Sequence, residues 1–546
     1  MSEALRYIVD LRCNYRSFFW VTSGNSTTLY VMKTTLLIVL LALTICHSQV
    51  KAQKQISLPR STPEEQGVSA LAISAFLDSV AKSKHEFHSF MLVRHGKVIA
   101  ESWWAPYRSD LKHTLYSLSK SFTATAVGFA KAEGKLALTD KVISFFPGQL
   151  PDSVSPYLQQ LNVKDLLTMS VGQDPDPTGN VTQTKDWVRS FLALPIKNEP
   201  GSRFLYNSMA TYMLSAIVQK KTGQRISEYL QPRLFGPLGI TGIDWETDLN
   251  GVNTGGWGLR LKTEDIAKFA QLFLQKGKWD GKQVLPEGWA EEASAAQIIQ
   301  HPQYSKAKRD SSDWEQGYGY QMWRCRNNGF RGDGAFGQYA IILPEQDAVI
   351  AITSETVDMQ GELNLIWNVL LPAMQNNNSM PNKSADAALN KRLSSLSLPV
   401  KKESIHPKSS DLTTKTFTID PNSMDIQSAT LDPKDNTCKL GFTTGTGTYS
   451  FNFAAESWTT GETTFAGPYL VGRATNNLKG LSPFKVAGEY TWTSANTLEL
   501  VLRYTESAHM RKLLCTFDGD KISIAVERSF LPGAEGGTVL LTGKRK

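Results

Sequence analysis

The clearest helical pattern along the chain lies in residues 200–223, PGSRFLYNSMATYMLSAIVQKKTG. Its apolar positions recur at i, i+3, i+4, i+7 and i+8, the spacing of one helix face: Met209, Tyr212, Met213, Ala216 and Ile217. Ser208 is the expected N-cap and Gly223 the expected C-cap. The pattern therefore predicts a helix, with Tyr206 and Ser208 on the turn that precedes it.

Two stretches show the pattern of paired strands. Residues 89–104, SFMLVRHGKVIAESWW, predict two strands joined at His95 and Gly96. Residues 338–353, QYAIILPEQDAVIAIT, predict two more strands joined by residues 344–347. Together they indicate an antiparallel sheet that is assembled from both ends of one domain, residues 56–374.

The composition and the hydrophobic pattern of the chain change after this domain. Residues 375–410 are polar and basic, which is typical of a linker with room for one short helix. Residues 411–546 contain short strand-like segments separated by Asn, Asp, Gly or Pro, the pattern of an all-β sandwich or barrel. Four aromatic residues here either line a ligand cavity or fill the β core, and strand spacing favours the core: Trp458, Trp492, Tyr504 and Phe517.

The N-terminal part predicts export. Residues 32–52 combine a short positive start, an apolar run and a small-residue exit, as a signal peptide does, with cleavage expected after Ala52. Residues 1–31 are then interpreted as a start-site extension, and the mature protein as periplasmic or secreted without a membrane span. A retained membrane anchor is the alternative. Lipidation of Cys46 is disfavoured, because the preceding Ile45 is not small.

Composition narrows the function classes. At 546 residues, with 41% hydrophobic and 20% charged residues, the chain fits two soluble globular units. The net charge of +7 is spread along the sequence, so a nucleic-acid partner is not supported. After cleavage Cys438 and Cys515 are candidates for one disulfide, which leaves Cys325 free. The eight histidines are dispersed and no CxxC occurs, so neither a metal nor an organic cofactor is expected.

One short motif contains candidate catalytic residues. Ser117 and Lys120 in YSLSKS stand at i and i+3, so a helix would place both on one face. A serine hydroxyl is a weak nucleophile, and a desolvated neutral lysine beside it can accept its proton. Tyr206 can relay protons to a leaving group. The simpler alternatives are a capping serine with a solvated lysine, and a tyrosine that only packs.

With these motifs in order the chain resembles the serine β-lactamase and penicillin-binding-protein superfamily, in its class C-like branch of carboxypeptidases, esterases and amide hydrolases. The resemblance covers about residues 61–374. It rests on stretches that occur in a fixed order: SLSK (117–120), LNVKDLLTMSVGQ (161–173), YNS (206–208), LFGPLGI (234–240) and DGAFGQYAIILPEQDAVIAITSE (333–355). The chain is also similar to hydrolases of aminohexanoate oligomers, which share the Tyr-x-Ser variant.

The resemblance implies an α/β fold in which an antiparallel sheet packs against helices, with an all-helical lobe and the active serine at their junction. It makes Ser117 the acylated nucleophile, Lys120 its general base and Tyr206 a second acid/base. It also implies an oxyanion hole built from the backbone N–H groups of Ser117 and Ala335.

Two departures from the family pattern bear on substrate choice. The second motif ends in Ser208 and has Asn207 in the middle, and both are candidates for positioning the substrate. The third motif, which supplies a cation for a substrate carboxylate, is replaced by NGFRGDGAFGQ (328–338), where Arg331 is the candidate substitute.

The sequence thus predicts an exported serine hydrolase that cleaves an ester or amide bond of a small or peptide-like substrate through a Ser117 acyl-enzyme. The missing cation favours esters or non-peptidoglycan amides over penicillins. One alternative is a D-alanyl-D-alanine carboxypeptidase or class C-like β-lactamase. A second is a ligand-binding sensor without turnover. Whichever of these functions holds, the C-terminal β domain is a candidate for contact with the cell wall or a polymer.

Overall fold

The computed structural model of the chain describes residues 56–375, 382–402, 413–434, 436–471, 483–530 and 537–546. These belong to one unit by their backbone contacts, Gln55–Lys546. The expected start-site extension, the signal peptide and Cys46 lie outside the described residues. Within the described ranges, no helix combines the length and the apolar character needed to cross a membrane.

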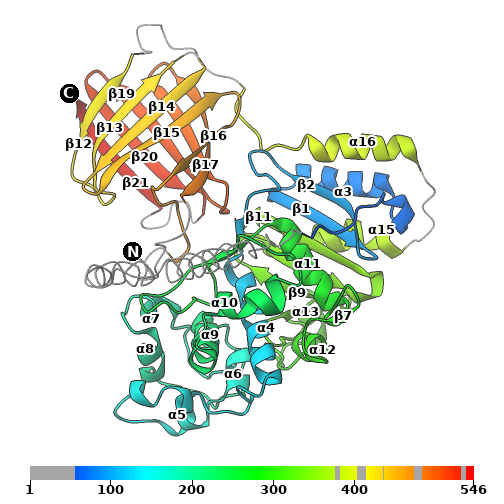
Figure 1. Cartoon of the computed structure of the whole chain (residues 1–546). Helices are drawn as coiled ribbons and strands as arrows, with labels where there is room; N and C mark the ends of the chain where they lie inside the picture. The colour runs from blue at the N-terminus through cyan, green and yellow to red at the C-terminus, as the bar shows by residue number, and fades with distance from the viewer. Residues whose placement is uncertain (1–55, 376–381, 403–412, 435, 472–482, 531–536) are drawn as a thin grey trace, which may run out of the picture. The chain divides into compact units, whose positions relative to one another are not determined.

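The N-terminal part of this unit is organised around an antiparallel sheet (Figure 1). In the described residues the sheet has 6 strands in the order β2-β1-β11-β10-β9-β8. Their bounds are β1 Glu86–Arg94, β2 Lys97–Trp103, β8 Trp323–Arg324, β9 Phe330–Gly334, β10 Gln338–Leu343 and β11 Ala348–Glu355. β1 pairs with both β2 and β11, and β10 pairs with β11. The two predicted hairpins are therefore confirmed, as is the sheet built from both ends of the first domain.

Helices cover both faces of this sheet, which explains its continuous apolar strands. Tyr339 and Ile341 of β10 pack in the core shared with α3, Ala70–Lys82. The alternate residues Ala340 and Ile342 pack in the core shared with α11, Thr263–Leu274. Each large apolar side chain buried in this way contributes about 1.5–3 kcal/mol.

An all-helical lobe follows α4, Ser119–Ala132 (Figure 1). Its helices are α5 Pro156–Gln160, α6 Val163–Leu167, α7 Thr178–Val181, α8 Trp187–Ala193, α9 Ser208–Thr222 and α10 Ile226–Leu230. The helix predicted from the apolar period is α9, and Gly223 ends it with a φ of 71°. Its N-cap is Asn207 and not Ser208, which is the first helical residue. The predicted sheet, flanking helices and helical lobe are therefore confirmed.

Part of the predicted linker belongs to the hydrolase-like domain. Helix α16, Lys383–Ser394, packs on α3 and β2 with Leu389 and Leu393 buried. The Ser102 hydroxyl donates to the carbonyl of Leu393 at 2.6 Å. The short helix anticipated within the polar stretch thus extends the domain beyond residue 374. The remaining shorter helices are α12 Trp289–Ser294, α13 Lys306–Asp310, α14 Met359–Leu365 and α15 Leu371–Gln375.

The C-terminal part is a closed sheet, which decides between sandwich and barrel. Its described strands are β12 Lys415–Ile419, β13 Ile426–Pro433, β14 Thr437–Thr444, β15 Gly447–Ala455, β16 Thr459–Thr463, β17 Phe484–Ser494, β18 Thr497–Tyr504, β19 Met510–Asp518, β20 Lys521–Arg528 and β21 Thr538–Arg545. They are ordered β15-β14-β13-β12-β21-β20-β19-β18-β17-β16, and β15 also pairs with β17. This pairing closes a β-barrel of the described strands other than β16, and we call the domain the barrel.

Side chains fill the interior of the barrel. Trp492 and Tyr504 are buried in its core, and Phe517 packs against that core, as the strand spacing predicted. Trp458 differs, because it packs against the core that includes α3 of the first domain. Cys438 and Cys515 are free thiols buried among apolar side chains, so the disulfide considered from the sequence is not formed. Cys325 is also a free thiol.

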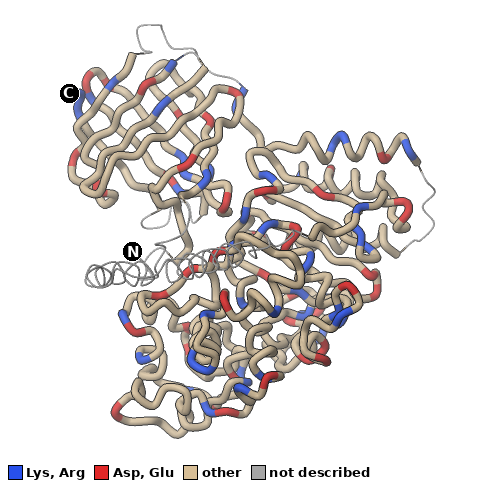
Figure 2. Tube along the Cα trace, in the orientation of Figure 1, with Lys and Arg blue, Asp and Glu red and all other residues tan. Residues whose placement is uncertain are grey.

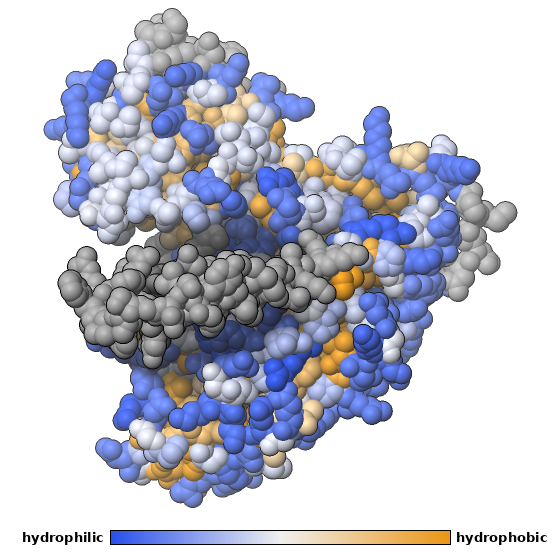
Figure 3. Space-filling view, viewed as in Figure 1, coloured by the Kyte–Doolittle hydropathy of each residue, from blue (hydrophilic) through white to orange (hydrophobic). Residues whose placement is uncertain are grey.

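Within the described ranges, residues of opposite charge are mixed along the chain (Figure 2). Lys and Arg alternate with Asp and Glu along the described trace (Figure 2). The visible face is mostly hydrophilic with small apolar areas (Figure 3), and exposed large apolar residues such as Leu71, Leu249 and Val357 lie in separate segments of the chain. The described residues therefore present no basic stripe of the kind that tracks a nucleic-acid backbone.

Candidate active site

Ser117 lies on a tight turn at the start of α4. The turn is a single 3₁₀ helix, Tyr116–Leu118, that runs directly into Ser119. Tyr116 has a φ of 46°, a left-handed conformation that is costly for a bulky residue and needs surrounding contacts to hold it. The backbone N–H of Leu115 is fixed by the carbonyl of Leu259 at 2.9 Å. The nucleophile candidate thus stands on a constrained backbone beside a helix N-terminus.

Lys120 lies beside Ser117, as the i, i+3 spacing predicts. Its Nζ is 2.9 Å from Ser117 Oγ, 3.0 Å from Ser208 Oγ and 2.7 Å from the carbonyl oxygen of Gly256. A neutral amine has two N–H donors and one lone pair. The Gly256 carbonyl and the Ser208 hydroxyl can take the two donors, which leaves the lone pair for the Ser117 proton.

Burial makes the neutral form of Lys120 accessible. Only 1% of the residue is exposed, and this desolvation lowers the pKa of Lys120 to about 7. Asp176 and Asp333 act in the opposite direction but do not outweigh burial. A lysine in this state can serve as a general base near neutral pH.

Tyr206 completes the cluster. Lys120 Nζ lies 4.8 Å from the centroid of the Tyr206 ring, which stacks on Trp323 at 5.6 Å. Burial, with help from Asp333, raises the pKa of Tyr206 well above its ordinary value, although a hydrogen bond with Ser117 works against this. The phenol therefore keeps its proton beside Ser117 near neutral pH.

Asn207 is not placed to contact a substrate. Its side-chain oxygen accepts from the backbone N–H groups of Met209 at 2.9 Å and Ala210 at 3.1 Å, so it caps α9. Its amide nitrogen donates to Gln173 at 2.9 Å, and the residue is 1% exposed. The predicted substrate-positioning role is thus corrected to a structural one, whereas Ser208 does face Lys120.

Arg331 is also unavailable to a substrate carboxylate. Its side chain is fully buried and forms an ion pair with Asp333 at 2.9 Å. It also donates to the carbonyl of Asp313 at 3.0 Å and lies over the Trp314 ring. The prediction that Arg331 replaces the missing cation is therefore contradicted by its position, because every face of the guanidinium meets protein.

Asp333 and Trp323 are site residues that the sequence analysis did not single out. Burial raises the pKa of Asp333, although Arg331, Lys120 and a hydrogen bond from Trp323 oppose that shift. The acidic residue stands on the strand where related hydrolases are expected to carry a cation. The acidic residue in place of the cation was visible in the sequence of residues 328–338, and this was the signal by which Asp333 could have been found.

Ala335 lies directly after β9, next to the segment that leads to Ser117. A Cβ added to Gly334 would come within 2.0 Å of the carbonyl oxygen of Leu115, so the end of β9 lies directly against the segment that leads to Ser117. The Gln338 side chain donates to the carbonyl of Ala335 at 3.1 Å. The location suits the predicted pair of oxyanion donors, Ser117 and Ala335. Within the residues that the structure describes, no three His, Cys, Asp or Glu side chains lie together in a way that could hold a metal ion.

Comparison with known proteins identifies the family. The family model named Beta-lactamase matches residues 80–371, more than half of the 546 residues. The chain therefore belongs to the Beta-lactamase family and is a serine hydrolase of that family.

Individual relatives cover different shares of the chain. A 6-aminohexanoate-dimer hydrolase of Paenarthrobacter ureafaciens is 28% identical over 324 residues, 55% of this chain and 80% of that protein. A protein of Escherichia coli (strain K12), provisionally named D-alanyl-D-alanine carboxypeptidase, is 24% identical over 243 residues, 38% of this chain and 55% of that protein. The octameric penicillin-binding protein homologue of Pyrococcus abyssi has 15% identity and a TM-score of 0.44 over 86% of this chain and 99% of its own.

Proposed function

We propose that the protein is an exported hydrolase of esters or non-peptidoglycan amides that works through an acyl-enzyme on Ser117. One observation carries the proposal: a buried lysine whose pKa is about 7 lies 2.9 Å from the serine hydroxyl oxygen. A capping serine beside a solvated lysine, the simpler interpretation of the motif, would leave Lys120 exposed, and it is not.

The contacts support a definite order of proton transfers. Lys120 takes the proton of Ser117 as Oγ forms a bond to the substrate carbonyl carbon, and the carbonyl oxygen becomes an oxyanion. The C–O or C–N bond then breaks as Tyr206 gives a proton to the leaving group and regains one from Lys120. Water attacks the acyl-Ser117 carbonyl by the same path in reverse and releases the acid.

The choice of substrate class rests on charge around the cluster. The one arginine on β9, Arg331, is held by Asp333, and the carboxylates of Asp333 and Asp176 influence Lys120. A substrate with a carboxylate next to the bond to be cleaved, as in β-lactams and D-Ala-D-Ala peptides, would meet acidic groups there. The 6-aminohexanoate-dimer hydrolase among the relatives agrees with cleavage of a small amide.

Substrate assays on the purified protein test this proposal. We expect a short-chain aryl ester to be turned over faster than a cephalosporin or a D-Ala-D-Ala peptide. The Ser117→Ala variant should lose about 10³-fold or more in kcat, while Ser79→Ala, a serine on the outer helix α3, keeps wild-type rates. A cephalosporin hydrolysed much faster than the ester would contradict the substrate class. Full activity of Ser117→Ala would contradict the mechanism.

A further inference from the structure

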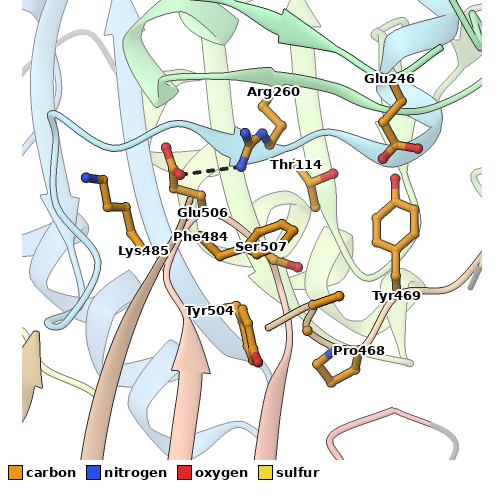
Figure 4. Close-up of a pocket in the computed structure, with 12 residues that line it drawn as sticks. Thr114, Glu246, Arg260, Pro468, Tyr469, Phe484, Lys485, Tyr504, Glu506 and Ser507 are labelled. Atoms are coloured by element: carbon orange, nitrogen blue, oxygen red, sulfur yellow. Dashed lines mark hydrogen bonds and ion pairs between the residues drawn. The ribbon is translucent and has the colours of Figure 1, made fainter. Parts of the chain in front are cut away.

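Residues of the barrel contact the turn that carries Ser117 and the segment before it. Tyr469, between β16 and β17, stacks on Tyr116 with ring centroids 5.3 Å apart. Its hydroxyl points toward Glu246 beside a cavity of about 60 Å³, on whose wall Arg260 pairs with Glu506 of the barrel (Figure 4). The backbone N–H of Thr114 donates to the carbonyl of Glu506 at 3.0 Å. Barrel loops therefore make direct contact with the segment that leads to Ser117.

His509 is the barrel residue whose side chain forms a hydrogen bond with the Tyr116 hydroxyl. It precedes β19 and is 0% exposed. Its Nδ1 lies 2.6 Å from Glu355 at the end of β11, and its Nε2 lies 2.5 Å from the Tyr116 hydroxyl. Because a carboxylate can only accept, Nδ1 carries a proton, and in a neutral imidazole Nε2 accepts from Tyr116. Glu355 also accepts from Ser529 of the barrel at 2.6 Å.

The same ring contacts Phe336, the residue after Ala335. The centroid of Phe336 lies 4.7 Å from that of His509, with the rings perpendicular, and 5.6 Å from that of Tyr116. Phe336 follows Ala335 as Tyr116 precedes Ser117. Both aromatic residues have left-handed backbones, with φ of 68° and 46°. Such conformations persist only where neighbouring groups fix them.

We propose that His509 is a positioning residue of the oxyanion hole: by holding Tyr116 and Phe336, it fixes the backbone N–H groups of Ser117 and Ala335. The barrel is then a working part of the active site. This inference rests on the proposed function, because an oxyanion hole has a role only if Ser117 attacks a carbonyl.

The geometry explains why a side chain so far along the chain would affect the rate. Oxyanion donors must point at the position where negative charge develops, and an error of about 1 Å in placement can cost about 100-fold in rate. A hydrogen bond to Tyr116 and an edge contact to Phe336 constrain both backbone segments from one rigid ring. Glu355 holds that ring and Ser529 holds Glu355 in turn, so few free rotations remain.

Two substitutions in the full-length protein remove the same hydrogen bond from opposite sides. Tyr116→Phe keeps the stacked ring and loses only the hydroxyl, and His509→Phe keeps an aromatic ring against Phe336. Each should slow inactivation by a small fluorophosphonate, and kcat for an aryl ester, by about tenfold or more while KM changes by less than about twofold. The double variant should be no slower than the slower single one, because the two residues act as one unit.

A matched control separates this role from general support of the barrel. Trp458→Leu weakens barrel packing on the core around α3 but contacts neither Tyr116 nor Phe336. All rates are compared well below each variant's Tm, and we expect Trp458→Leu to lower Tm yet react within about twofold of the wild type. If Trp458→Leu slows the reaction as much as His509→Phe does, or if Tyr116→Phe reacts at the wild-type rate, the inference is wrong. A wild-type protein that does not react contradicts the proposed function itself.

Discussion

Lys120 is the residue on which the proposed chemistry depends, and its titration sets the pH dependence. Burial lowers the pKa of Lys120 to about 7, so the amine is mostly protonated below that pH and neutral above it. Only the neutral amine can accept the Ser117 proton. We therefore expect the fluorophosphonate inactivation rate, measured between about pH 5 and 9, to rise through about pH 7 and then level off. A flat profile would contradict the role of Lys120.

Replacement of Lys120 should separate activity from stability. The unfolded lysine binds a proton up to its ordinary pKa of 10.5, whereas the folded one releases it near 7, so its charge costs stability as pH falls through that window. Lys120→Met removes this cost. We expect acylation to fall by about 10³-fold or more, with Tm at pH 7 unchanged or higher. A large fall in Tm would show that the amine mainly stabilises the fold.

Helix α9 owes its start to Asn207, and this can be tested against a substrate-binding role. Asn207→Ala removes two N-cap hydrogen bonds and one to Gln173, so we expect a loss of about 1–2 kcal/mol in the free energy of unfolding, measured with denaturant. KM for an aryl ester should stay within about twofold at temperatures where the variant is folded. A selective rise in KM without loss of stability would instead support direct contact with the substrate.

Strand β9 depends on the buried pair of Arg331 and Asp333. Arg331→Met leaves the Asp333 carboxylate buried without its partner, and we expect a loss of about 3–5 kcal/mol in stability. The double variant Arg331→Met/Asp333→Asn should recover part of that loss, which thermal unfolding would show. Affinity for anionic substrates should not change selectively. If Arg331→Met weakens only the binding of anionic substrates, the carboxypeptidase or β-lactamase alternative is correct.

These helices and strands also show which parts of the structure could be predicted from the sequence. The apolar period of α9 and the short apolar runs of β1, β2, β10 and β11, with their intervening turns, are local features, so they were predictable. Ser208 and Asn207 are both good N-caps one residue apart, and propensity alone could not choose between them. Arg331 and Asp333 stand two apart on one strand, so their side chains share a face, and that spacing was a usable signal for the pair. Complete burial of the guanidinium depends on residues from distant segments such as Asp313 and Trp314.

At the scale of the whole molecule, contacts between the barrel and the first domain decide how the site is completed. Tyr116 and His509 are 393 positions apart in the chain, which no local pattern can connect. Arg503 of the barrel binds Glu86 of β1 through two hydrogen bonds of 2.6 and 2.9 Å. His88 lies 3.0 Å from the same carboxylate. The sequence predicted both domains but gave no sign that the second one contributes to the site.

This charged contact predicts the response to acid. Burial would raise the pKa of Glu86, but Arg503 and His88 outweigh it and lower that pKa to about 2, so its stabilisation is lost as pH falls from 4.5 toward 2. Burial lowers the pKa of His88, which faces Glu86, His113 and Arg503, so stability already declines as pH falls below 6.5. We expect Tm to fall in both windows.

The variant Arg503→Gln serves as the comparison for that acid response. Without the guanidinium, the pKa of Glu86 should lie nearer its ordinary value, so the fall of Tm between about pH 4.5 and 2 should become shallower than in the wild type. The decline below pH 6.5 should remain, because it belongs to the buried histidines. Identical acid profiles of the two proteins would show that the Arg503–Glu86 pair does not stabilise the contact.

The central claim is that Ser117 is an activated nucleophile, and intact mass after brief exposure to a small fluorophosphonate tests it most directly. We expect the folded wild-type protein to gain one adduct and the Ser117→Ala variant to gain none. A folded wild-type protein that gains no adduct, or a Ser117→Ala variant that is labelled equally well, would contradict the hydrolase mechanism and favour a ligand-binding role without turnover.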